Sequence, residues 1–141
     1  MIYELIYNSI SAKDFDKKSL PDILLKSRSW NSANQITGCL VYHESEFLQI
    51  LEGPEEMVKE LYNRIILDHR HYNVQLLAQG PIKERAFADW CMAYYDFSVT
   101  NNSAKNKISV DLLLQITGKM NDTTIARSLF KFITEDIFRS K

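Results

Sequence analysis

Glycine, proline and cysteine are scarce in this chain of 141 residues, which contains four glycines, three prolines and two cysteines. The chain has no G-x-G-x-x-G segment and no Walker loop, and it also lacks G-x-S-x-G and H-E-x-x-H. These absences exclude a Rossmann cofactor site and leave the common hydrolase motifs unrepresented. Cys39 and Cys91 form no C-x-x-C pair, so we expect no disulfide framework.

Excess charge and long apolar segments are missing as well. The 17 basic and 18 acidic side chains give a net charge of −1, so no global positive field favours a nucleic-acid partner. No apolar run approaches the ~18 residues of a membrane span, and no basic segment precedes an apolar one at the N-terminus. With 45% hydrophobic and 25% charged residues, the composition is typical of a globular domain. We expect a reduced, cytoplasmic protein with no membrane partner.

Hydrophobic periodicity predicts the order β-α-β-β-α-β with one extra strand. Strands are predicted at 2–7, 36–42, 46–52, 74–78 and 90–97, and helices at about 20–29 and from Pro54 to about Asp68. A tight connection at His43-Glu44-Ser45 joins two of the strands, and Gly80-Pro81 is read as a turn. With right-handed crossovers, this order closes into an α+β, ferredoxin-like sheet that has both helices on one face and strands one and three as neighbours.

The composition changes after Phe97. Residues 98–107 are polar and predict a linker, and two amphipathic helices follow, the first over 109–117 and the second from about Asn121. We therefore divide the chain into a domain at 1–97, a linker at 98–107 and a C-terminal helical extension at 108–141. The extension either covers the open face of the sheet or leaves that face to a partner.

Gln49 is the most informative polar residue, because it lies inside a predicted central strand, Phe47-Leu48-Gln49-Ile50-Leu51. A buried amide needs partners, since each unmet polar group costs about 1–3 kcal/mol. Strand alternation puts Gln49 and Tyr7 on the helix-covered face. Asn31, placed between the first helix and the next strand, could face the same gap. An Asn, a Gln and a Tyr without a strong acid or base suit an amide-like heterocycle better than hydrolysis.

Simpler interpretations of the same residues stay open. The Tyr7–Gln49 pair could be a satisfied core hydrogen bond, or Gln49 could face solvent, and Asn31 could be a helix cap. His69 and His71 stand two residues apart without nearby cysteines or a carboxylate cluster. We therefore expect no metal site there, and we interpret both as histidines at a helix C-terminus.

Five segments in fixed order resemble BLUF domains, blue-light sensors that use FAD. The resemblance covers residues 1 to about 97 and rests on Leu5 to Ser9, Asn31 to Gly38, Phe47 to Gly53, Asp68 to His71 and Phe87 to Met92. It implies that the FAD ring lies between the two helices of the sheet domain. Short members of the family also have two helices after the domain.

The resemblance implies a role for each matched residue. Asn31 and Gln49 would bond the polar edge of the flavin, and Tyr7 would bond Gln49 and act as electron and proton donor to the light-excited flavin. The Gln49 amide would then rotate or tautomerise, which changes the hydrogen bonds at the flavin carbonyl without net chemistry. The resemblance also implies four further cofactor-binding residues, which are Ile65, Asp68, Arg70 and His71. It implies two relay residues in strand five, Trp90 and Met92, and leaves open which of the two faces the site.

Two positions depart from the family pattern. Cys91 stands where serine is common, which could alter the hydrogen bonds of strand five, and Trp30 precedes Asn31 where relatives often have a polar residue. Because the sequence ends at Lys141, we expect no attached enzyme and an output through a homo-oligomer or a downstream protein partner. The alternative is a non-photoactive, ferredoxin-like flavin- or ligand-binding interaction module. An acylphosphatase-like hydrolase is disfavoured because the Asn8 to Lys18 loop supplies no phosphate cradle.

Overall fold

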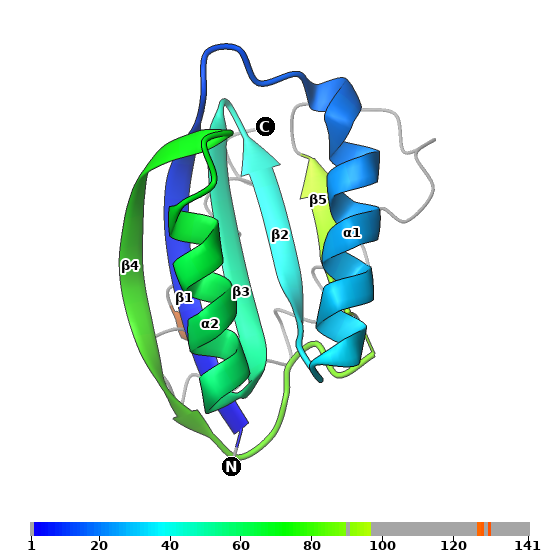
Figure 1. Ribbon diagram of the computed structural model, residues 1–141. Coiled ribbons are helices and arrows are strands. Elements are labelled where there is room, and N and C mark those ends of the chain that lie inside the picture. The colour runs from blue at the N-terminus through cyan, green and yellow to red at the C-terminus, as the bar shows by residue number, and fades with distance from the viewer. Residues whose placement is uncertain (1, 90, 97–126, 129, 131–141) are drawn as a thin grey trace.

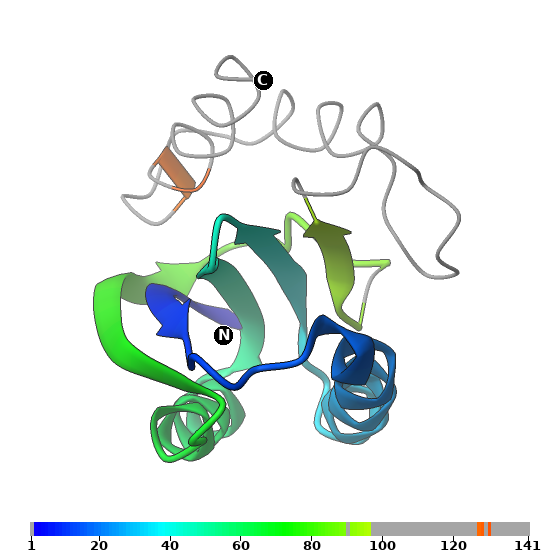
Figure 2. The ribbon, with the colours of Figure 1, turned by 90° about the horizontal axis from the view of Figure 1, so that it is seen from above.

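A computed structural model describes residues 2–89, 91–96, 127–128 and 130. Five strands form one sheet in the order β4-β1-β3-β2-β5 (Figure 1). Both helices lie on the same face of this sheet (Figure 2). The ferredoxin-like α+β prediction is confirmed, including the adjacent strands one and three. Along the chain the elements are β1 (Ile2–Ser11), η1 (Lys17–Ser19), α1 (Leu20–Ala33), β2 (Thr37–His43), β3 (Glu46–Pro54), α2 (Glu55–Ile66), β4 (His71–Ile82) and β5 (Ala93–Asp96).

Two crossovers build the sheet. β3 lies between β1 and β2 and is antiparallel to both, so the connection through α1 passes over β3. β4 is antiparallel to β1 on the other side, and the connection through α2 therefore passes over β1. β5 runs parallel to β2 at the opposite edge. Crossovers of one hand place both helices on one face.

The hydrophobic core lies between the sheet and the helices. Alternation along β1 and β3 directs Leu5, Tyr7, Phe47 and Leu51 toward the helices, because successive side chains of a strand point to opposite faces. The helices complete the cluster with Leu20 and Leu24 from α1 and Val58 from α2. Each of these buried apolar side chains contributes about 1.5–3 kcal/mol relative to exposure.

The β2–β3 hairpin turns over two residues with positive φ, Glu44 at 47° and Ser45 at 67°. Two consecutive positive φ values are typical of the turn whose twist matches antiparallel strands. The break predicted at these residues is thus confirmed, although neither residue is the asparagine or glycine that such turns favour.

β4 is longer than predicted. It extends over His71–Ile82 rather than 74–78, and Gly80-Pro81 lies inside the strand instead of forming a turn. Among the described strands, β4 is at the edge and pairs with β1 alone, so the missing N–H of Pro81 can face the side without a described neighbour. The register between β4 and β1 shifts between Ile6 and Tyr7 and again between Asn8 and Ile10. Asn73, which lies at the second shift, has a φ of 55°. Such bulges re-aim side chains, and these two flank Tyr7.

Other boundaries differ from the predictions. α1 continues to Ala33 rather than Ser29, and the last strand begins at Ala93 rather than residue 90. The predicted linker at 98–107 and the predicted helix at 109–117 lie outside the described residues, as does Trp90. In the part of the chain that is described, no helix has the length and apolar content needed to cross a membrane.

The sheet face away from the helices carries a buried ionic contact. Arg127 lies with its Nε 3.3 Å from Glu4 Oε1, and Figure 2 shows the short described segment at 127–128 and 130 on this side of the sheet. Both side chains are almost completely buried. Phe130 is fully buried nearby and meets Phe87 edge to face, with ring centroids 5.7 Å apart. Residues from the distal part of the chain therefore contact the back of the sheet.

Candidate functional site: a pocket between two helices

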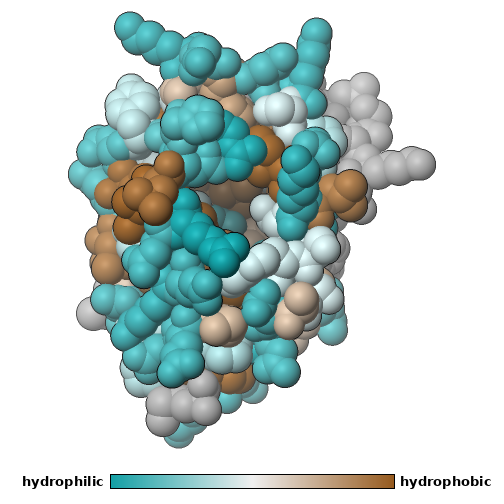
Figure 3. Space-filling model, in the orientation of Figure 1, coloured by the Kyte–Doolittle hydropathy of each residue, from teal (hydrophilic) through white to brown (hydrophobic). Residues whose placement is uncertain are grey.

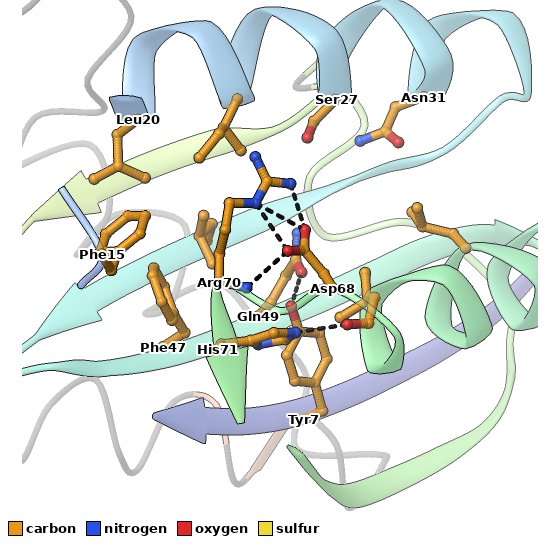
Figure 4. A pocket seen from close by; sticks show the side chains of 14 residues that line it. Tyr7, Phe15, Leu20, Ser27, Asn31, Phe47, Gln49, Asp68, Arg70 and His71 are labelled. Atoms are coloured by element: carbon orange, nitrogen blue, oxygen red, sulfur yellow. Dashed lines mark hydrogen bonds and ion pairs between the residues drawn. The ribbon is translucent and has the colours of Figure 1, made fainter. Parts of the chain in front are cut away.

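A pocket of about 120 Å³ opens between α1 and α2 above the sheet. Figure 3 shows the hollow on this face of the molecule, and Figure 4 shows side chains from both helices and from the strands converging on it. Its walls combine apolar and polar groups. The lining residues are Tyr7, Phe15, Leu20, Ile23, Ser27, Asn31, Leu40, Phe47, Gln49, Leu61, Ile65, Asp68, Arg70 and His71.

Tyr7 and Gln49 meet on the floor of the pocket. They are register partners across β1 and β3, and both are buried. The Tyr7 hydroxyl donates a hydrogen bond to Gln49 Oε1 (Figure 4). The other end of the amide, Nε2, donates to the sulfur of Met92 at 3.2 Å. The amide therefore has a phenol at its acceptor end and a thioether at its donor end.

Burial raises the pKa of Tyr7 above its ordinary value of 10.0, and the charges that Tyr62 and Asp68 can carry raise it further. A charged phenolate would lose its hydration in this environment. Tyr7 is consequently a neutral hydrogen-bond donor throughout the neutral pH range. Tyr7 can lose its proton only in a process that also removes an electron, because proton loss alone would leave a negative charge on the phenolate.

Asn31 lies in the last turn of α1, not between the helix and β2 as the sequence suggested. The longer helix points the Asn31 side chain into the pocket wall, where only 1% of the residue is exposed. Its Nδ2 donates to the carbonyl oxygen of Cys91 at 2.8 Å, whereas its buried Oδ1 has no hydrogen-bond partner among the residues that the structure describes. An unmet buried acceptor costs about 1–3 kcal/mol, so this oxygen is suited to an N–H group of a ligand.

His71 is the first residue of β4 rather than part of a helix C-terminus. Its Nε2 lies 2.6 Å from the Ile65 carbonyl oxygen, and its Nδ1 lies 2.7 Å from Ser9 Oγ. Because a carbonyl can only accept, Nε2 must donate to Ile65, and Nδ1 of a neutral ring accepts from the Ser9 hydroxyl. His71 thus ties the end of α2 to β1 and presents its ring to the pocket. The described residues contain no cluster of metal-binding side chains.

Asp68 and Arg70 form an ion pair at the pocket opening (Figure 4). Arg70 Nε lies 2.9 and 3.0 Å from the two carboxylate oxygens. Partial burial alone raises the pKa of Asp68, but the hydrogen bonds and positive charge of Arg70, with a smaller contribution from His71, hold that pKa below its usual value. Arg70 remains half-exposed, so it offers positive charge at the entrance.

Met92 lies directly before β5 with 2% of its surface exposed, and its sulfur contacts Gln49. The structure therefore places Met92 beside the hydrogen-bonded pair of Tyr7 and Gln49. Sequence reasoning missed Arg28, whose guanidinium binds the Met92 carbonyl oxygen. Its position three residues before Asn31, on the same side of a helix, was the available signal. The residues missed as pocket lining include Phe15, Ile23, Ser27, Leu40 and Leu61.

These features fit an aromatic, amide-like ring. Phe47, Leu40 and Leu61 offer apolar contacts to its faces, and the unpartnered Oδ1 of Asn31 can accept from a ring N–H. Gln49 supplies an amide at the floor, and Arg70 supplies charge at the opening, where an anionic tail would lie. A flavin combines such a ring with a phosphate-bearing tail, so the residues present fit this class of cofactor.

A family model described as sensors of blue light using FAD matches residues 2–93. The chain belongs to the BLUF family. These residues form a sensor domain rather than an enzyme, and FAD is the cofactor that defines the family. The BLUF resemblance noted from five short motifs is thereby confirmed.

Curated relatives match the BLUF region. The blue light- and temperature-regulated antirepressor BluF of Escherichia coli K12 is 35% identical over 96 residues, which are 68% of this chain and 24% of that protein. The photoactivated adenylate cyclase subunit beta of Euglena longa is 35% identical over 89 residues, which are 62% of this chain and 10% of the relative. The chain thus spans about a quarter or less of the length of these curated relatives.

Solved BLUF structures have the same fold. BlsA in its ground state is 29% identical, with a TM-score of 0.69 and coverage of 100% of this chain and 90% of BlsA. The dark-state structure of BlrB is 31% identical with a TM-score of 0.66, covering 69% of this chain and 74% of BlrB. These BLUF neighbours support the fold described above.

Proposed function

We propose that this BLUF domain senses blue light through a hydrogen-bond switch formed by Tyr7 and Gln49. The observation that carries the proposal is the arrangement of the buried Gln49 amide, with Tyr7 at its Oε1 and Met92 at its Nε2. An amide is nearly isosteric after a half-turn, yet its donor and acceptor ends exchange. Such a group can adopt two different hydrogen-bonding arrangements without any movement of the backbone.

When bound, FAD absorbs blue light and becomes a strong acceptor of electrons. Tyr7 would supply one electron and its phenolic proton to the bound cofactor and would then take both back, so that no bond is made or broken overall. The raised pKa of Tyr7 suits this role, because the phenol keeps its proton until the electron leaves. While Tyr7 is oxidised, its hydrogen bond to Gln49 Oε1 is lost.

The loss of that hydrogen bond frees Gln49 to turn or tautomerise. In the turned arrangement Nε2 faces Tyr7 and the amide oxygen faces the Met92 side. The hydrogen bonds offered to the cofactor then differ from those of the starting state, which is the origin of a small shift of its absorption to longer wavelength. Met92 also meets a different end of the amide, so the change reaches the segment that leads into β5.

Other pocket residues hold the cofactor in this proposal. Asn31 accepts from the ring through its unpartnered Oδ1, and Ile65 and the ring of His71 form part of the wall. Asp68 orients Arg70, and Arg70 faces the anionic tail. Trp90 keeps its proposed relay role from the family resemblance, although it lies outside the described residues.

The output of the proposed sensor is an assembly with a second copy or a downstream protein in the cytoplasm. The BluF relative is described as an antirepressor, an activity that requires a protein target. The C-terminal extension is the proposed reader, supported by the contact of Arg127 with Glu4 on the back of the sheet and by the contact of Phe130 with Phe87 in the connection between β4 and β5. Size measurements of one sample in darkness and in blue light test whether assembly changes.

Absorption spectroscopy of the purified protein tests the switch. We expect a yellow protein whose absorption moves reversibly to longer wavelength in blue light, and we expect Tyr7→Phe and Gln49→Leu to abolish the shift. Tyr62→Phe is the matched control, because the Tyr62 ring packs 5.6 Å from the Tyr7 ring but takes no part in the hydrogen bond to Gln49. This control should retain the shift.

Two results would contradict the proposal at different levels. A colourless protein after expression with ample flavin would contradict the claim that this chain binds the cofactor. A yellow protein without any light-induced change would leave the alternative, a flavin-binding interaction module without photochemistry.

A further inference from the structure

The last two turns of α1 hold two consecutive carbonyl groups of the segment before β5. Arg28 donates to the Met92 carbonyl oxygen from Nε at 3.0 Å and from Nη2 at 2.8 Å. Asn31 Nδ2 donates to the neighbouring carbonyl oxygen of Cys91 at 2.8 Å. A helix that forms one wall of the pocket is therefore bonded directly to the residue that contacts Gln49.

The backbone of Cys91 and Met92 depends on these bonds. β5 begins at Ala93, so neither residue belongs to a strand of the sheet. The two donors of Arg28 converge on one oxygen, and charged donors form stronger hydrogen bonds than neutral ones. Burial lowers the pKa of Arg28, partly offset by Cys91, yet a guanidinium stays charged at any physiological pH.

Met92 is fixed at both ends. Its carbonyl oxygen is held by Arg28 on α1, and its sulfur accepts from Gln49 Nε2 at 3.2 Å. We propose that Arg28 is a positioning residue of the switch, which keeps the Met92 sulfur against Gln49 and thereby sets how fast the lit arrangement returns to the dark one. This inference rests on the proposed light-sensing function.

The direction of the effect follows from hydrogen-bond chemistry. The Met92 sulfur can accept from Nε2 only while the amide has its described orientation. In a turned amide the oxygen faces the Met92 sulfur, and a thioether has no hydrogen that it could donate to this oxygen. Holding the sulfur in place therefore favours the described orientation. Releasing it should slow dark recovery roughly two- to fivefold, the change expected from the loss of about one weak hydrogen bond.

The experiment measures dark recovery of the FAD-loaded full chain after a blue flash. Arg28→Ala should slow recovery but keep the amplitude of the absorption shift, and Arg28→Lys, which retains a charged donor, should restore part of the rate. Lys26→Ala is the control on the same helix, since the Lys26 side chain is 78% exposed and pairs only with Asp22 among the contacts described. It should recover like the unmodified protein.

A double-mutant cycle with Met92→Leu separates positioning from general destabilisation. Leucine keeps the volume but not the sulfur, so Met92→Leu should slow recovery by itself, and adding Arg28→Ala should slow it no further. If Arg28→Ala changes the rate equally in both backgrounds, or leaves it unchanged in the original one, the inference is wrong while the switch proposal stands.

A measurement in darkness keeps the inference testable even if no light response exists. With ¹³C-labelled methionine methyl groups, the Met92 resonance is assigned by its loss in Met92→Leu. Arg28→Ala should move this resonance much more than those of the other methionines, and Arg28→Lys should move it less. An unmoved Met92 resonance would overturn the positioning role.

Discussion

Glu4 and Glu52 are register partners on β1 and β3, and both are buried on the sheet face opposite the pocket. Three residues further along the same two strands, Tyr7 and Gln49 are paired on the pocket face. The strand pair that carries the proposed switch therefore also carries an acidic pair on its other face. Arg127 binds Glu4, and backbone N–H groups of Ala86 and Phe87 bind Glu52 at 2.6 and 2.9 Å.

Replacing Arg127 should strongly destabilise the fold. Arg127→Met removes a buried cation and leaves Glu4 without this partner, so we expect a loss of about 3 kcal/mol in the free energy of unfolding. The measurement is urea unfolding followed by circular dichroism. Lys59→Met, which breaks an exposed pair with Glu55, should cost far less stability, because solvent screens exposed ion pairs. Equal losses for the two variants would mean that the Arg127 contact adds nothing to stability.

The β2–β3 turn should accept a stabilising double substitution. Glu44 and Ser45 both have positive φ, a region that non-glycine residues enter at a cost of about 1–2 kcal/mol each. Asn and Gly are the residues that this type of turn favours. Glu44→Asn combined with Ser45→Gly should therefore raise the free energy of unfolding by about 1 kcal/mol. Thermal unfolding checks this prediction, and a lower melting temperature would contradict it.

Removing the Asn31 amide should weaken cofactor binding. Asn31→Leu deletes the buried acceptor that is proposed to bind the flavin ring, so FAD affinity should fall about 10- to 100-fold. Flavin fluorescence titration of the refolded apoprotein measures this change. Asn34→Ala is the control, because Asn34 is bonded to the Trp30 carbonyl and does not line the pocket. Affinity that is unchanged in Asn31→Leu would remove Asn31 from the cofactor site.

The Asp68–Arg70 pair should add stability only above acidic pH. The pKa of Asp68 is held below its ordinary value of 3.8, so the folded state favours the charged carboxylate. This contribution is present above pH 3.8 and is lost as the pH falls through the lowered folded-state pKa. Asp68→Asn should therefore be less stable than the original protein at neutral pH, and the difference should shrink progressively as the pH falls below 3.8. A difference that persists at low pH would rule out the ion pair as its cause.

Local rules predicted that Tyr7 and Gln49 could meet. Strand alternation assigned both to the same face, and the crossover rule made their strands neighbours, but a solvent-facing Gln49 stayed open until the structure showed the hydrogen bond. The family motifs then supplied Asn31, Asp68, Arg70 and His71, and all four line the pocket.

Long-range contacts explain what local rules missed. The sequence from Trp30 to Asn34 suggested a turn, but α1 continues to Ala33, and the bonds of Arg28 and Asn31 to Met92 and Cys91 hold this end of the helix. Likewise, no periodicity reveals that Glu4 is buried, because its partner Arg127 lies 123 residues away in the sequence. Gly80-Pro81 was misread because an edge strand tolerates residues that usually end a strand.

β5 pairs with β2 alone among the described strands and is only four residues long. Few backbone hydrogen bonds therefore hold β5 in the sheet, and its amide hydrogens should exchange with deuterium faster than those of the other described strands. Because β5 follows Met92 directly, this short strand is the first part of the sheet that a change in the contact between the Gln49 amide and the Met92 thioether would reach in the proposed switch.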